Sequence, residues 1–113
     1  MLKGFLSASL PSLPCADRFA VADTRNFRQR CIDGEPLIGT FAAIPHPVAI
    51  EVTAAAGVDF LCIDWEHAQI SRERIEDLLR AADVHGVPAM VRVPGHAPEQ
   101  IAAVLDAGAR GVL

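Results

Sequence analysis

Short apolar runs alternate along this chain with longer segments in which apolar residues recur every three or four positions. Four runs predict β-strands, at residues 37–42, 58–63, 88–93 and 110–113. These runs are nearly continuous in their apolar character and do not alternate with polar residues. Such strands are typical of a parallel sheet whose faces are covered by other elements.

The segments between these strands predict helices at residues 45–57, 71–86 and 98–108, and a short helix at 26–34 precedes the first strand. Each between-strand segment has a helix-start residue, proline or Ser71, near its beginning and ends at a glycine. The repeated strand–helix unit predicts an α/β fold with a parallel sheet, either an open doubly wound sheet or a (β/α)8 barrel. Both architectures bind ligands at the carboxyl ends of their strands.

Composition narrows the classes of partner. The 113 residues are 51% hydrophobic and carry a net charge of −4, which excludes a disordered chain and a basic nucleic-acid arm. No stretch reaches the roughly 18 apolar residues of a membrane span. We therefore expect neither a nucleic acid nor a membrane as partner.

The cysteines and the first residues bear on location. Cys15, Cys31 and Cys62 form neither a disulfide framework nor a metal-binding CxxC motif, which predicts a reducing, cytoplasmic setting. Residues 1–25 show no sustained period and are expected to form an irregular, disordered leader. A signal peptide is the alternative, but serines and prolines interrupt its apolar run.

Polar residues gather after the predicted strands. His46 follows the first strand, Asp64 to His67 follow the second, and Arg92 and His96 lie near the end of the third. His85 precedes a strand and belongs to the opposite end. Three of the four histidines thus share one end with carboxylates and a guanidinium, which predicts a functional site there.

Each of the central residues has a structural and a chemical interpretation. Asp64 either caps the following loop or accepts a hydrogen bond from the His67 imidazole, fixing its tautomer and leaving the other nitrogen as a base. Arg92 lies in an apolar strand, where a guanidinium needs an anion: a bound substrate, or a structural ion pair with Asp64 or Glu66.

The remaining residues at this end are less informative. His46 and His96 are either exposed loop residues or substrate contacts, and Trp65 is either a wall of the site or a packing residue.

The sequence lacks the residues that several catalytic mechanisms require. Lys3 is the only lysine and lies in the leader, so none of the predicted strands offers a Schiff-base amine. Neither a GxGxxG nor a GxxxxGK[ST] motif follows a strand, and there is no G-x-S-x-G nucleophile motif. Acid–base and electrostatic chemistry on a small anionic substrate, helped by a metal ion, is what remains.

Three segments resemble the HpcH/HpaI aldolase family: GEPLIGTF at 34–41, AAAGVDFLCIDWEHA at 54–68 and VPAMVRVPG at 87–95. Members are class II, pyruvate-dependent aldolases related to the citrate lyase β subunit. The resemblance covers residues 26–113 and implies a (β/α)8 barrel in a homo-oligomer, typically a hexamer. It also implies cleavage of 4-hydroxy-2-oxo acids to pyruvate, or a similar 2-oxo acid, and an aldehyde.

Carried over residue by residue, the resemblance makes His67 the catalytic base and Asp64 the carboxylate that pairs with it. It makes Arg92 the group that binds the 2-oxo oxygen and stabilises the enolate. Glu66 matches the glutamate of the D-x-E-H-A motif and is expected to support the site or contact substrate. The divalent cofactor, Mg²⁺, Mn²⁺ or Co²⁺, is held in the family by a Glu and an Asp from later strands, so no metal ligand is expected in this chain.

The chain ends before those later strands, and a complete barrel takes ~250 residues. We therefore expect residues 26–113 to form the N-terminal portion of the barrel, with about four strands and three crossover helices, inactive on its own. Two alternatives remain: a catalytically inactive fragment that binds a partner, and a complete flavodoxin-like module such as a receiver domain. The second lacks the acidic residues and the lysine that a receiver needs.

Overall fold

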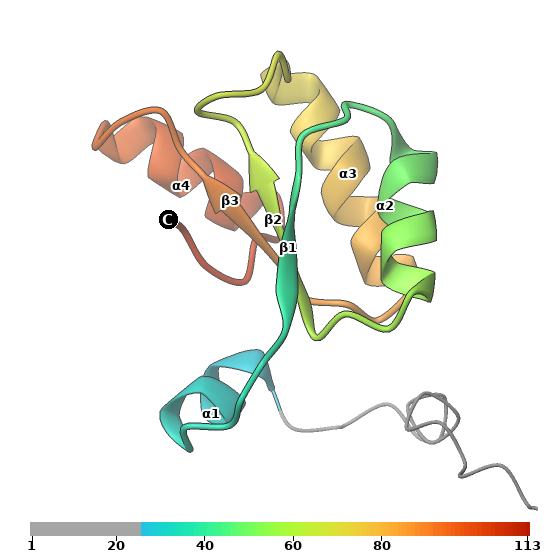
Figure 1. The fold of residues 1–113 in the computed structure, drawn as a ribbon. Helices are drawn as coiled ribbons and strands as arrows, with labels where there is room; N and C mark the ends of the chain where they lie inside the picture. Colours follow the sequence, from blue (N-terminus) through green and yellow to red (C-terminus); the bar gives the residue numbers. More distant parts are fainter. Residues whose placement is uncertain (1–25) are drawn as a thin grey trace, which may run out of the picture.

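The computed structural model describes residues 26–113 and contains a parallel sheet of three strands (Figure 1). They are β1 (Gly39–Ala42), β2 (Phe60–Asp64) and β3 (Ala89–Arg92). Their order in the sheet is β1-β2-β3, and Val112 continues it by a parallel bridge to Val91. The predicted strands at 37–42, 58–63 and 88–93 are confirmed with small shifts in their ends. The fourth predicted strand is present only as this bridge.

The helices also lie where the sequence predicts them. They are α1 (Phe27–Ile32), α2 (Pro47–Ala55), α3 (Arg72–Val84) and α4 (Pro98–Asp106). The Ser71 hydroxyl accepts a hydrogen bond from the backbone N–H of Arg74 at the start of α3, and Gly86 follows its end with φ 66°. A hydroxyl cap supplies an acceptor for a helix-end N–H, and glycine adopts positive φ without a Cβ clash.

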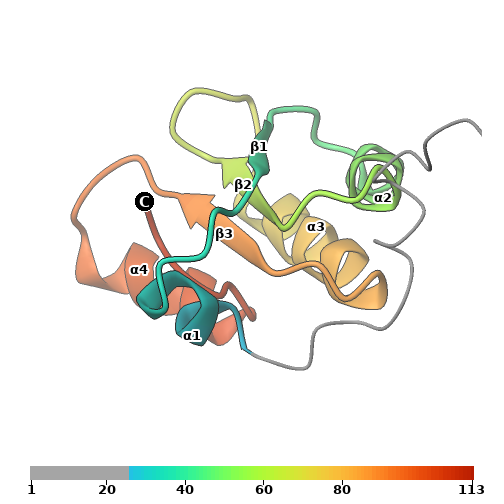
Figure 2. The same cartoon turned by 60° about the horizontal axis from the view of Figure 1, so that its bottom comes forward.

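The core lies between the sheet and the helices α2, α3 and α4. Leu61 and Ile63 of β2 and Val91 of β3 are fully buried, and they form one apolar cluster with side chains from each of these three helices. Across the sheet the helices follow in the order α2, α3, α4 (Figure 2). Since all three contribute to the same cluster, they cover the same face of the sheet.

The other face of the sheet carries the alternate residues of each strand. Side chains of neighbouring strand residues point to opposite faces, so Phe60, Cys62 and Asp64 point away from the helices. Gly39, opposite Phe60 in the register, allows the Phe60 ring to lie against the β1 backbone where a Cβ would clash. The face opposite α2, α3 and α4 therefore ends in a carboxylate at the carboxyl end of β2.

The strand order of the described residues differs from that of a flavodoxin-like module. A flavodoxin-like sheet places its first strand between the second and third, whereas here β2 is the central strand. Sequential order with helices on one face is what successive units of a barrel show. None of the helices in residues 26–113 has the length and apolar character needed to cross a bilayer.

The predicted leader, residues 1–25, lies outside the described residues, and Cys15 lies there too. Cys31 is an exposed free thiol, and Cys62 is a buried one. Burial raises the pKa of the Cys62 thiol.

Candidate active site

Asp64 and Arg92 end neighbouring parallel strands and face one another. They are Cα partners in the register of β2 and β3, so their side chains leave the same face of the sheet at the same height. Arg92 donates from Nε to Asp64 Oδ1 at 3.0 Å and from Nη2 to Oδ2 at 2.6 Å. This bidentate geometry matches the planar guanidinium to the carboxylate. The structure thus contains the ion pair that the sequence leaves as one interpretation of Arg92.

Asp64 also shapes the loop that follows it. Its Oδ1 atom accepts a hydrogen bond from the backbone N–H of His67 at 3.0 Å, so the carboxylate caps the turn after β2. Here the structure differs from the predicted pairing of Asp64 with the His67 imidazole. Asp64 contacts the backbone of His67, because both of its oxygens face the guanidinium that the sheet register places beside them.

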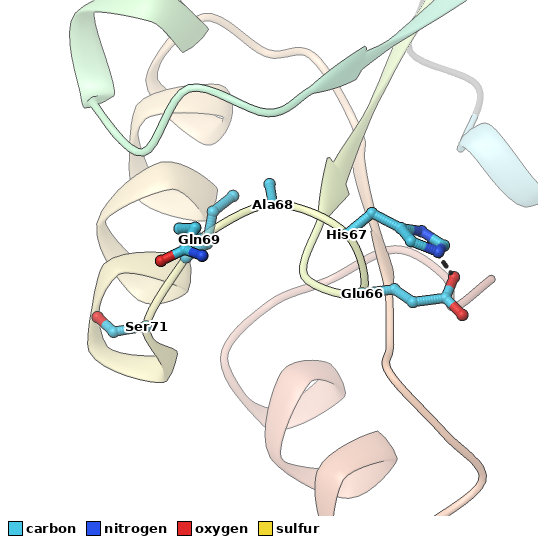
Figure 3. Close-up of a pocket in the computed structure, with 6 residues that line it drawn as sticks. Glu66, His67, Ala68, Gln69 and Ser71 are labelled. Carbon is cyan, nitrogen blue, oxygen red and sulfur yellow. Dashed lines mark ion pairs between the residues drawn. The ribbon is translucent and has the colours of Figure 1, made fainter.

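The carboxylate beside the imidazole belongs to Glu66. Its Oε2 atom lies 3.4 Å from His67 Nδ1 and 3.3 Å from Arg92 Nε. Figure 3 shows the two side chains pointing toward one another from the β2–α3 loop. Both are solvent-accessible, with the His67 side chain 64% exposed and that of Glu66 38%.

Phe41 supports the guanidinium from β1 and was not predicted as a site residue. The Arg92 Cζ atom lies 4.7 Å from the centre of the Phe41 ring, a cation–π distance. Phe41 is an aromatic residue at the end of an apolar strand, which resembles any core residue in sequence. Only the sheet, with β1 and β3 flanking β2, brings it beside Arg92.

The electrostatics of the pair follow from these contacts. Hydrogen bonds from the Arg92 guanidinium, with a smaller contribution from the His67 N–H, hold the pKa of Asp64 below its usual value against the opposing effect of desolvation. Asp64 in turn raises the pKa of Arg92. Asp64 is therefore ionised at neutral pH and Arg92 is charged, so the site contains a fixed guanidinium.

The other predicted residues lie around this centre without joining it. The His46 Nδ1 atom accepts the backbone N–H of Val48 at 3.2 Å, and this residue caps α2. His96 is exposed in the loop after β3, and Trp65 is partly buried against the core. His85 ends α3, at the amino end of β3, as predicted.

A shallow, open depression adjoins Glu66 and His67. It is lined by the β2–α3 loop and the start of α3, namely Glu66, His67, Ala68, Gln69, Ile70 and Ser71. Glu66 and His67 lie at one end of it, and Gln69 and Ser71 lie at the other (Figure 3). A small polar substrate can therefore reach the imidazole from solvent.

The side chains that could bind the predicted divalent ion are engaged with one another in the described residues. Among residues 26–113, no group of three or more His, Cys, Asp or Glu side chains is placed to hold a metal ion. Both oxygens of Asp64 and one oxygen of Glu66 already face Arg92 or His67. These side chains alone do not make a site for the ion that the resemblance implies.

Comparison with known proteins identifies the family. The family model of HpcH/HpaI aldolase/citrate lyase matches residues 37–113. Hydroxypyruvate/pyruvate aldolase of Roseovarius nubinhibens is 40% identical over 95 residues, which are 81% of this chain and 36% of that protein. 4-Hydroxy-2-oxovalerate aldolase of Novosphingobium aromaticivorans is 37% identical, over 78% of this chain and 34% of that protein. The chain thus spans about a third of the length of these relatives.

Solved structures give the same result. Citrate synthase SbnG superposes with a TM-score of 0.72 and 42% identity, covering 76% of this chain and 35% of that one. A HpcH/HpaI aldolase/citrate lyase family protein from Burkholderia cenocepacia shares 40% identity, over 75% of this chain and 34% of that one. Macrophomate synthase superposes with a TM-score of 0.69 and 36% identity, over 77% of this chain and 32% of that one. With the matched residues including all of β1, β2 and β3, this chain belongs to the HpcH/HpaI aldolase/citrate lyase family.

Proposed function

We propose that the protein is a carbon–carbon lyase that cleaves 4-hydroxy-2-oxo acids into pyruvate, or a similar 2-oxo acid, and an aldehyde. The observation that carries this proposal is the Asp64–Arg92 pair beside the accessible His67, at the carboxyl ends of two parallel strands. Relatives of the chain include proteins named as aldolases for 4-hydroxy-2-oxo acids, which supports the choice of reaction.

The residues suit the two demands of a retro-aldol reaction. A base must remove the proton of the C4 hydroxyl, and the electrons of the breaking C3–C4 bond then pass to the 2-oxo oxygen as an enolate. The accessible imidazole of His67 supplies the base. Arg92 supplies the charge for the enolate oxygen: its Nη1 atom donates to none of the described residues, while Nε and Nη2 are held by Asp64.

Asp64 therefore acts in our proposal as the anchor of Arg92 and of the His67 loop. A guanidinium fixed by two parallel hydrogen bonds and an aromatic ring does not reorient as charge develops, which preserves its stabilising effect. Glu66 is the remaining charged side chain of the site, and because it adjoins His67 we expect it to contact the substrate.

Several further features are proposed for the complete protein. They are a (β/α)8 barrel, a divalent ion (Mg²⁺, Mn²⁺ or Co²⁺) held by a Glu and an Asp beyond Leu113, a homo-oligomer of hexameric type and a cytoplasmic location. The sequential order of the described strands supports the barrel. The cysteine pattern supports the location.

The direct test is an assay of pyruvate release. A full-length protein containing this sequence is incubated with Mg²⁺, Mn²⁺ or Co²⁺ and a series of 4-hydroxy-2-oxo acids, and pyruvate is measured with lactate dehydrogenase and NADH. We expect metal-dependent release that EDTA abolishes. A folded full-length protein that releases no 2-oxo acid from any member of the series would overturn the proposal.

The 113-residue chain alone should release no pyruvate under the same conditions. Its described residues supply a base and a guanidinium but not the expected metal ligands, and copies of the same residues would not add them. Turnover comparable to that of the full-length protein would show that residues 1–113 already contain the whole catalytic site.

A further inference from the structure

The helix α2 differs from the other described helices in the group that caps its amino end. The His46 Nδ1 atom accepts the backbone N–H of Val48 at 3.2 Å. The Asn26 amide oxygen caps α1 and the Ser71 hydroxyl caps α3, while α4 has no side-chain cap. Among the helices of residues 26–113, only α2 is therefore capped by a side chain of the type that gains a proton near neutral pH.

Pro47 prepares His46 for this role. A residue that precedes proline is kept out of the helical region and adopts an extended backbone, which is also the conformation of an N-cap residue. His46 has φ −139° and ψ 130° accordingly. Pro47 has no N–H of its own, and the N–H of Ala49 donates to the His46 carbonyl at 3.0 Å. The N–H of Val48 is thus the donor of the first turn that depends on the imidazole.

The cap requires a neutral imidazole. A neutral ring has one acceptor nitrogen, and with Nδ1 accepting from Val48 its proton is on Nε2. Protonation places an N–H at Nδ1 as well, so two donors then face one another and the hydrogen bond is lost. The imidazolium also adds a positive charge at the positive end of the helix dipole. His46 is exposed, so protons reach the ring from solvent.

No charged side chain of the described residues forms an ion pair or a hydrogen bond with His46. β1 has no titratable residue, and the acids of the Asp59–Asp64 segment are bound by Arg30 and Arg92. α3 packs against α2. The charged residues of these two helices are Glu51 of α2 and Arg72, Glu73, Arg74, Glu76, Asp77, Arg80 and Asp83 of α3. The state of the cap therefore depends on the proton of His46 itself.

We propose that His46 is a pH-sensitive cap that keeps the first turn of α2 ordered while its imidazole is neutral and loosens that turn when the imidazole is protonated. The His46 N–H also donates to the Ile44 carbonyl at 2.8 Å, so the effect extends into the β1–α2 loop. Figure 1 shows this loop leading from the carboxyl end of β1 to the start of α2. Phe41, which contacts Arg92, lies at that end of β1, so the cap adjoins the side of the sheet that holds the candidate site.

The test is hydrogen–deuterium exchange, read by mass spectrometry, on a full-length protein containing this sequence. Labelling is done at about pH 8 and about pH 5.5, on either side of the range in which histidines titrate, with times scaled for the intrinsic exchange rate. In the wild type, scaled exchange of the first turn of α2 should be roughly fivefold faster at the lower pH, the size expected for the loss of one cap. The first turn of α3, capped by the Ser71 hydroxyl, is the internal reference and should not change.

Three variants separate the cap from other effects of pH. His46→Asn supplies a cap that does not titrate, so exchange should be slow at both pH values. His46→Ala has no acceptor, so exchange should be fast at both. His85→Asn, at an exposed histidine that ends α3, is the matched control and should retain the wild-type response of α2.

Two results would overturn the proposal: scaled exchange of α2 that is the same at both pH values in the wild type, or a pH response that persists in His46→Asn. The order of this turn is measured without substrate. A protein that releases no 2-oxo acid would therefore refute the proposed function and leave the pH-sensitive cap standing, and the reverse result would refute only the cap.

Discussion

The two ends of the sheet each hold an arginine between two carboxylates, but different groups adjoin the two arginines. At the carboxyl end, Arg92 contacts Asp64 and Glu66. At the amino end, Arg30 of α1 donates to Glu35 and to Asp59, both at 3.0 Å. Figure 1 shows α1 at the amino end of β1, apart from the other helices.

The backbone contacts of the two clusters are also alike. Asp59 accepts the backbone N–H of Ile38 at 2.9 Å, just as Asp64 accepts that of His67. At the amino end, an aromatic contact between Phe27 and Phe60 adds to the same attachment of α1. The cluster around Arg30 thus holds α1 and the segment before β1 against the start of β2.

The difference lies in what adjoins each arginine. Beside Arg92 there is an accessible imidazole and an open depression, at the strand ends where parallel sheets bind ligands. The described residues near Arg30 include no histidine in contact with it. An arginine with two carboxylates is therefore a structural device by itself, and its neighbours decide whether it also does chemistry.

The sharpest test of this comparison replaces a histidine at each end of the sheet by alanine, in two separate variants. His67→Ala in the full-length protein should reduce kcat for aldol cleavage by at least about 100-fold, since it removes the proposed base. Metal affinity should change little. The control is His85→Ala at the opposite end, which should leave turnover near the wild-type value. Near-normal turnover in His67→Ala, measured as pyruvate release, would remove the base assignment.

A second test replaces each of the two arginines by lysine. Arg92→Lys retains the charge but loses the planar fork that meets Asp64, and it should lower kcat/KM about 30- to 1,000-fold. Arg30→Lys weakens the bridge that the guanidinium makes between Glu35 and Asp59 at the amino end, and it should lower the melting temperature with little change in kcat/KM. A loss below tenfold in Arg92→Lys would mean that Arg92, like Arg30, is structural.

The smallest expected effect is a pH dependence of stability. Because Arg92 holds the folded-state pKa of Asp64 below the unfolded value of about 3.9, the unfolded chain takes up the proton first as the pH falls. The stabilising contribution of the pair is complete above about pH 5 and is lost as the pH falls through the folded pKa. The difference in free energy of unfolding between wild type and Asp64→Asn, from urea titrations, should therefore shrink below about pH 4.

An Asp64→Asn difference that stays constant from neutral pH to about pH 3 would contradict this ionic contribution. It would mean that Asp64 stabilises the protein through hydrogen bonds alone, whichever its protonation state.

Much of the fold could be predicted because its signals are local. Ser71 and Gly86 delimit α3 through the backbone groups that they satisfy within a few residues. The apolar runs of β2 and β3 were recognisable as buried parallel strands. Val112 was less predictable: whether residues 110–113 extend as a strand depends on neighbours along its open side, and in the described residues it pairs only with β3.

The candidate site shows where sequence stops and tertiary structure begins. The sequence by itself determined which groups stand at the carboxyl ends of the strands, because strand and loop boundaries are set locally. Which carboxylate meets which partner was decided only by the register of β2 and β3, which pairs Asp64 with Arg92 across 28 residues of sequence. With Asp64 paired to Arg92, the carboxylate beside the His67 imidazole is that of Glu66, and the Phe41 ring lies against the guanidinium. Hydrogen bonds and ring contacts act over a few ångströms, and the separation of residues in the sequence does not determine such short distances.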